Sequence, residues 1–88
     1  MTNDHFWAAW AALPKGYTEG RYDGRRYGAT LRASSDGRRR WLYAEELGGT
    51  DFVSANVFVL SGGRPVVKPC EMPEEKVAAF VVGFRPDA

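Results

Sequence analysis

Four glycine-bearing turns divide the middle of this 88-residue chain into five short β-runs of nearly equal length. The turns are Asp23-Gly24, Asp36-Gly37, Gly48-Gly49 and Gly62-Gly63. Asp-Gly and Gly-Gly between apolar runs are strong signals of β-hairpins, because glycine readily adopts the positive φ that tight turns need. A helical pattern flanks this block at each end. The sequence therefore predicts an α+β fold, a five-stranded antiparallel meander with an N-terminal and a C-terminal helix packed on one face.

The five predicted strands cover residues 17–22, 25–33, 38–45, 52–60 and 64–68. The fourth alternates most clearly, and its β-branched valines mark the face that the helices should cover. Pro65 and Pro69 in the last run suit an edge strand, because proline cannot donate a ladder hydrogen bond. The predicted covered face consists of Tyr27, Leu31, Leu42, Val53, Val57 and Val59.

Residues 4–13 predict a short amphipathic helix, which Asn3 or Asp4 can cap. Pro73 begins the second predicted helix at a position where its missing amide does no harm, and Gly83 predicts its end. The apolar positions that should pack on the sheet are Phe6, Trp10, Leu13, Val77, Phe80, Val81 and Phe84.

The length predicts a single domain over residues 1–88, with little room for a large buried cofactor, and we expect none. No apolar run reaches the roughly 18 residues of a membrane span, and the N-terminus lacks a signal-peptide pattern. We therefore expect no membrane partner. A single cysteine cannot form an intrachain disulfide, so a reducing cytoplasm is the default expectation.

The charge of the chain is nearly balanced, with a formal net charge of +1, but it is unevenly distributed. Residues 21–40 hold seven arginines against two aspartates, which predicts a polarised surface. In the run Arg38-Arg39-Arg40, strand alternation should send neighbours to opposite faces and leave most of them in solvent. Phosphate contact through Arg25, Arg26 and Arg38 around the two Asp-Gly turns is the alternative interpretation.

The predicted open face of the sheet gathers aromatic and cationic side chains. They are Arg26, Thr30, Arg32, Trp41, Tyr43, Asn56 and Phe58. Large exposed aromatic patches are uncommon on monomers, so a homodimer or protein contact is one interpretation and cross-strand packing is another. Single-stranded nucleic acid could also stack on such rings, but Glu45 and Glu46 beside them oppose a polyanion. A register shift of one residue would move the whole set to the covered face.

Cys70 is the only residue that suggests catalysis, because it stands just before a predicted helix start, where a thiolate is favoured. The negative charges of Glu71, Glu74 and Glu75 oppose that effect. His5 is the only histidine, so thiols and imidazoles cannot build a metal site, and we expect no metal. Glu45, Glu46 and Asp51 could in principle act as acid and base or bind a cation, but as two adjacent glutamates and one loop aspartate they are better explained as a solvated strand end.

Residues 42–54 (LYAEELGGTDFVS) and 68–73 (KPCEMP) resemble a group of short uncharacterised proteobacterial proteins, some of which carry the label peptide methionine sulfoxide reductase. The resemblance covers residues 16–84. The label implies a thiol-dependent redox enzyme with Cys70 as its nucleophile. From the residues we instead predict a small non-enzymatic interaction module that self-associates through the open sheet face. A redox enzyme using Cys70 and a single-stranded nucleic-acid binder are the alternatives.

Overall fold

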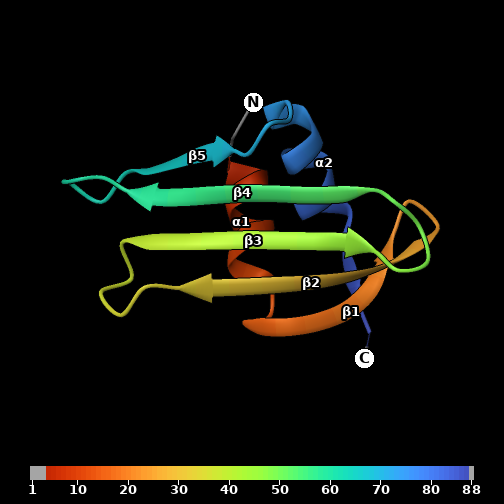
Figure 1. The fold of residues 1–88 in the computed structure, drawn as a ribbon. Coiled ribbons are helices and arrows are strands. Elements are labelled where there is room, and N and C mark those ends of the chain that lie inside the picture. Colours follow the sequence, from red (N-terminus) through yellow and green to blue (C-terminus); the bar gives the residue numbers. More distant parts are fainter. Residues whose placement is uncertain (1–3, 88) are drawn as a thin grey trace.

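The structure, a computed structural model, describes residues 4–87, so the predicted cap Asn3 lies outside the described residues. The elements are α1 (Asp4–Ala12), β1 (Gly16–Tyr22), β2 (Arg25–Ala33), β3 (Arg39–Glu46), β4 (Phe52–Val59), β5 (Pro65–Pro69), α2 (Glu74–Gly83) and β6 (Arg85–Pro86). All strand pairs are antiparallel, in the order β5-β4-β3-β2-β1-β6 (Figure 1). The predicted α+β class, with an antiparallel sheet and two helices, is confirmed.

The prediction of five strands is wrong, because the sheet has six. After α2 the chain turns to extended backbone at Phe84 and runs along the free edge of β1. The amide of Asp87 continues this pairing by donating to the carbonyl of Glu19 at 2.9 Å. Two residues, one of them proline, carry no alternating pattern, so β6 left no signal in the sequence. Its effect is to cover an edge that would otherwise expose unpaired amides and carbonyls.

The hairpin turns follow the glycine signals. Asp23 and Gly24 both have positive φ, 54° and 76°, as a type I′ turn between twisted strands requires. Each of the first five strands begins and ends within one residue of its prediction. β5 is an edge strand, in agreement with its two prolines. α2 ends at Gly83, and the amide of Phe84 then donates to the carbonyl of Phe80 at 2.8 Å.

Both helices lie on the same side of the sheet, behind it in Figure 1. Their apolar residues join the inner face of the strands in one buried cluster. The ring of Phe80 meets those of Tyr22 and Tyr27 edge to face, with centroids 5.1 and 5.4 Å apart. The buried core contains Phe6, Trp10, Tyr27, Leu31, Leu42, Val53, Val57, Val67, Val77, Phe80, Val81 and Phe84.

Candidate functional site: the outer face of the sheet

We call the side of the sheet that faces away from the helices the outer face. Cross-strand register assigns residues to it: Trp41 lies opposite Asn56 and Arg32, and Tyr43 lies opposite Thr30. The alternate positions Leu42 and Ala44 are buried on the inner face. The register therefore places all seven predicted surface residues, Arg26, Thr30, Arg32, Trp41, Tyr43, Asn56 and Phe58, on the outer face.

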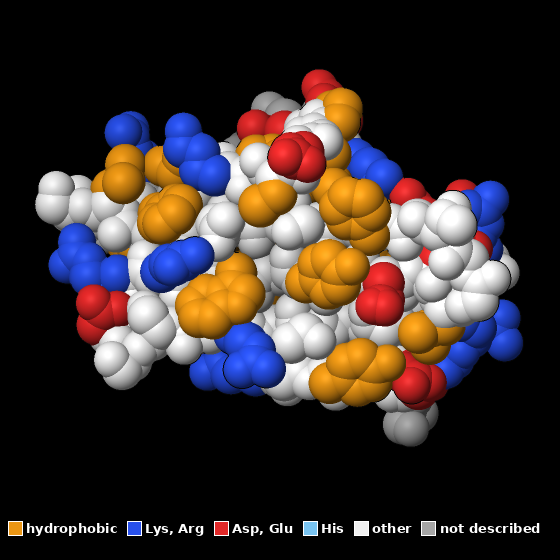
Figure 2. All heavy atoms as spheres, in the orientation of Figure 1, with side chains coloured by type: hydrophobic (Ala, Val, Ile, Leu, Met, Phe, Trp, Pro, Cys, Tyr) orange, Lys and Arg blue, Asp and Glu red, His pale blue; other side chains and the backbone are white. Residues whose placement is uncertain are grey.

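Five aromatic side chains share this face: Tyr17, Trp41, Tyr43, Phe52 and Phe58. Tyr17 is 58% exposed, Tyr43 is 46% exposed and Phe52 is 40% exposed. The rings of Tyr43 and Phe52 stack with centroids 6.3 Å apart. Figure 2 shows this side of the molecule, with hydrophobic side chains spread across its centre. From the sequence, Phe52 was expected at the end of this face but was not counted as a site residue. Tyr17 was not expected there, although its alternation with Glu19 could have identified it.

The guanidinium of Arg39 lies beside two aromatic rings, Trp41 and Phe58, at one end of the outer face. Its guanidinium carbon lies 5.0 Å from the ring centroid of Trp41 and 5.9 Å from that of Phe58. Its Nη2 also donates to Oδ1 of Asn56 at 3.3 Å. Cation–π contacts of this kind contribute about 0.5–1 kcal/mol each at exposed sites. Arg39 was therefore a missed site residue, because the sequence presented it only as part of an arginine run.

Gly28 allows Tyr17 to lie flat over the neighbouring strand. A Cβ at residue 28 would collide with the ring of Tyr17, so the ring occupies the space that a side chain would fill. The hydroxyl of Tyr17 donates to Oε2 of Glu19 at 3.1 Å. Glu19 and Glu45 are the two cross-strand partners of Gly28. An aromatic ring between two carboxylates therefore marks this end of the face.

Arg26, one of the predicted binding residues, is engaged within the chain. Its two Nη atoms donate to the carboxylate of Asp87 at 2.9 and 2.8 Å, and Nη2 also reaches Oε1 of Glu19 at 3.2 Å. The guanidinium lowers the pKa of Asp87. Arg32 is exposed and makes no hydrogen bond or ion pair with any residue between 4 and 87.

The charges on the outer face differ between its two ends. Arg32 and Arg39 lie at the end where β2 passes to β3, whereas the opposite end carries Glu19 and Glu45 together with Arg21 and the ion-paired Arg26. Figure 2 shows basic groups around both ends of this face, with acidic side chains beside the aromatic rings toward the right. The phosphate interpretation is not supported by this geometry, because Arg25 and Arg26 follow one turn and Arg38 follows the next, at the other end of the sheet.

Cys70 extends the pairing of β5, because its amide donates to the carbonyl of Ser54 at 2.9 Å. Its half-buried thiol accepts a hydrogen bond from Nδ2 of Asn56 at 3.5 Å. Within residues 4–87, no side chain other than Asn56 makes a hydrogen bond to this sulfur. His5 lies on α1, and the described part of the chain contains no group of three or more residues arranged to bind a metal.

Asp51 belongs to a polar network that the sequence did not reveal. It accepts a hydrogen bond from the hydroxyl of Tyr27 at 2.7 Å and one from Nζ of Lys76 at 2.7 Å. These bonds lower the pKa of Asp51, while burial and the bond to Asp51 raise the pKa of Tyr27 to about 12. The amide of Asp51 donates to Glu46 at 3.3 Å. The carboxylate of Asp51 therefore fastens the β3–β4 loop to Tyr27 of β2 and Lys76 of α2.

Comparison of the chain with protein-family models, with curated proteins and with solved structures finds no match. Neither helix of the described segment is long and apolar enough to cross a membrane. Inference about function therefore depends on the surfaces themselves.

Proposed function

We propose that this protein is a small non-enzymatic interaction module that self-associates through the outer face of its sheet. The observation that carries the proposal is the exposure of Tyr17, Tyr43 and Phe52 on one continuous face. Exposed apolar patches of this kind, edged by polar groups, are typical of protein contact surfaces. Aromatic and arginine side chains are also the residues most enriched at the centres of such interfaces.

The charges of Arg39 and Glu45, near the two ends of β3, favour one orientation of the two copies. In a symmetric dimer the same patch contacts itself. If the two-fold axis crosses the strands, the second copy is reversed along the strand direction, and the Arg39 end of one protomer faces the Glu45 end of the other. The opposite choice, with the axis along the strands, would place like charges over one another. Complementary charge therefore favours the reversed, face-to-face dimer.

The size of the face is sufficient for such a contact. The molecule measures 40 × 25 × 22 Å along its principal axes. A broad face of these dimensions spans on the order of 900 Å² in projection, comparable with a typical interface of about 800 Å² per partner. The single free thiol agrees with a module that works in a reducing compartment, and we place it in the cytoplasm on that ground.

Sedimentation equilibrium of the wild type and a Tyr43→Ser variant tests the proposal. We expect a concentration-dependent dimer for the wild type and at least tenfold weaker association for the variant, because Tyr43 lies at the centre of the face. The control is Ala12→Ser, a change at an exposed residue of α1 on the other side of the sheet, which should leave association unchanged. A wild-type monomer at millimolar concentration would refute the self-association.

Nucleic-acid binding through this face has less support. Arg39 already lies over Trp41 and Phe58, and Glu45 stands beside the exposed rings on β3. A fluorescent single-stranded oligonucleotide, titrated at two salt concentrations, should therefore show no salt-sensitive binding. A redox role at Cys70 rests on the resemblance and on the position of the thiol before α2, and a thiol titration against pH is its direct test.

A further inference from the structure

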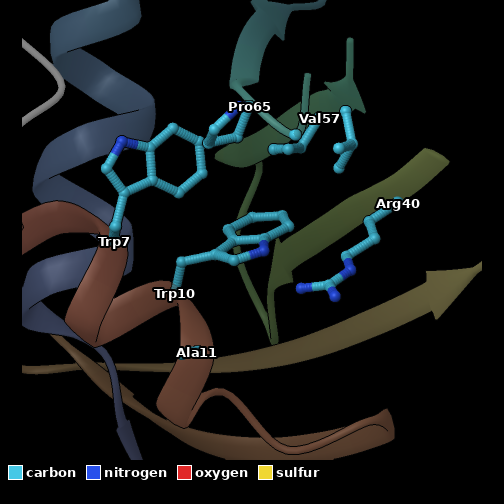
Figure 3. A pocket seen from close by; sticks show the side chains of 8 residues that line it. Trp7, Trp10, Ala11, Arg40, Val57 and Pro65 are labelled. Carbon is cyan, nitrogen blue, oxygen red and sulfur yellow. The ribbon is translucent and has the colours of Figure 1, made fainter. Parts of the chain in front are cut away.

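A cavity of about 230 Å³ opens on the side of the sheet opposite to the outer face. It lies between α1 and one end of the strands, as Figure 3 shows. Two indoles from α1 and the inner-face ends of β3, β4 and β5 form its walls. The residues that matter here are Trp7, Trp10, Arg40, Val57, Val59 and Pro65.

Arg40 is an unusual residue for this position. It lies opposite Val57 in the β3–β4 register and two residues before the buried Leu42, so its side chain belongs to the inner face. It is half-buried, and within residues 4–87 it makes no hydrogen bond or ion pair. In Figure 3 the guanidinium extends toward the ring of Trp10. A guanidinium among apolar walls is costly unless an anion accompanies it, and its planar donors match a carboxylate in two-pronged geometry.

The surroundings of Arg40 add positive charge and no negative charge. None of the residues between 4 and 87 that line the cavity is acidic. A smaller hollow of about 40 Å³ shares Trp10, Ala11 and Arg40 with it and adds Lys15, and none of its described lining residues is acidic. An anion in the cavity would therefore meet no repulsion from its walls. A neutral apolar molecule would leave the guanidinium without a partner.

We propose that this cavity is a binding site for a small organic carboxylate with a flat apolar body. The carboxylate accepts charge-assisted hydrogen bonds from Arg40, and the apolar body lies against the indoles of Trp7 and Trp10. A cavity of about 150 Å³ is enough for benzene, so this one accepts a single substituted ring or a bicyclic ring system. The site is independent of the proposed self-association, because it lies on the other side of the sheet.

Titration of the full chain with indole-3-carboxylate, followed by NMR, tests the proposal. The three tryptophans each give one indole N–H signal, which Trp7→Phe and Trp41→Phe variants assign. We expect the signals of Trp7 and Trp10 to shift with the carboxylate while that of Trp41, on the outer face, stays in place. The uncharged indole-3-carboxamide should bind about tenfold or more weakly, since hydrogen bonds to charged groups are the stronger ones.

Two arginine variants separate the site from general charge effects. Arg40→Gln should weaken the carboxylate about tenfold or more and remove its advantage over the carboxamide. Arg38→Gln removes an equal charge from the same run but lies outside the cavity lining, so it should bind as the wild type does. The weakest dissociation constant expected for so small a ligand is on the order of 10 millimolar. If the Trp7 and Trp10 signals did not shift at about that concentration of carboxylate, the proposal would be overturned. Equal binding of the carboxylate and the carboxamide by the wild type would overturn it too, and this comparison needs no variant to fold.

Discussion

The two faces of the sheet are formed by the same strands, but they differ in burial and in the size of their side chains. On β3, Ala44 is completely buried on the inner face, whereas its neighbour Tyr43 is 46% exposed on the outer face. The inner face uses small and branched residues that fit under two helices, and the larger rings of β3 and β4 point outward. Burial of apolar area is the main stabilising contribution to a fold, so the outer rings add little to the monomer and are available to a partner.

The largest expected difference between the faces is in stability. Leu42→Ala should lower the free energy of unfolding by about 2–5 kcal/mol, because it leaves a cavity in the packed core. Tyr43→Ala, one residue further, should cost under about 1 kcal/mol in the monomer, since its ring is half in water. Urea unfolding at low protein concentration measures both. Similar losses for the two variants would mean that the outer rings belong to the core.

The Asp51 network should give the next largest effect. Asp51→Ala leaves the hydroxyl of the buried Tyr27 without its acceptor, which should cost about 1–3 kcal/mol. Glu45→Ala is the control, because Glu45 is an exposed carboxylate at the same end of the sheet and should change stability by less than about 0.5 kcal/mol. If the two variants were equally stable, the network would not fasten the loop to α2.

The same network predicts the acid limb of the stability curve. The pKa of Asp51 is lowered in the folded state, so its contribution is complete above the unfolded value of about 3.9 and is lost as the pH falls through the folded pKa. Asp51→Asn should therefore be destabilised relative to the wild type near neutral pH, with a difference that shrinks below about pH 3.9. Urea midpoints measured between pH 2 and pH 7 would show this convergence, and a constant difference would contradict it.

The smallest expected effect concerns the cation on the outer face. Arg39→Met removes the contacts to Trp41 and Phe58 and should cost about 1 kcal/mol or less, since both are surface interactions. Loss of the guanidinium should also change the environment of the Trp41 indole, which its NMR signal reports. An unchanged Trp41 signal would show that Arg39 does not order this face.

Local patterns predicted most of the fold because the hairpins are encoded locally. Asp-Gly turns and strict alternation set the strand limits within one residue. β6 was missed because it consists of only two residues, and the Asp51 network was missed because Tyr27 and Lys76 lie 24 and 25 residues away in the sequence. Long-range partners of this kind leave no periodic signal.

The site was predictable in part for the same reason. Alternation from Leu42 assigns Trp41 and Tyr43 to the outer face, and it also assigns Arg40 to the inner face. The sequence predicts that most of the run Arg38-Arg39-Arg40 is solvated. That prediction did not anticipate that Arg39 and Arg40 contact different residues on opposite faces. Arg39 packs on rings across the strand, and Arg40 lies beside the tryptophans of α1. Alternation separates the faces of Arg39 and Arg40, but only the three-dimensional arrangement shows which residues each of them contacts.

Sedimentation equilibrium of two charge variants, alone and mixed, tests the reversed dimer most directly. Arg39→Glu and Glu45→Arg should each associate at least tenfold more weakly than the wild type, because each places like charges together. Arg39→Gln, which loses the ring contacts without reversing charge, measures the part due to packing. An equimolar mixture of the two charge variants should recover the dimer, since opposite charges meet again at both ends. A mixture that stays as monomeric as its components would contradict association through the outer face in this orientation.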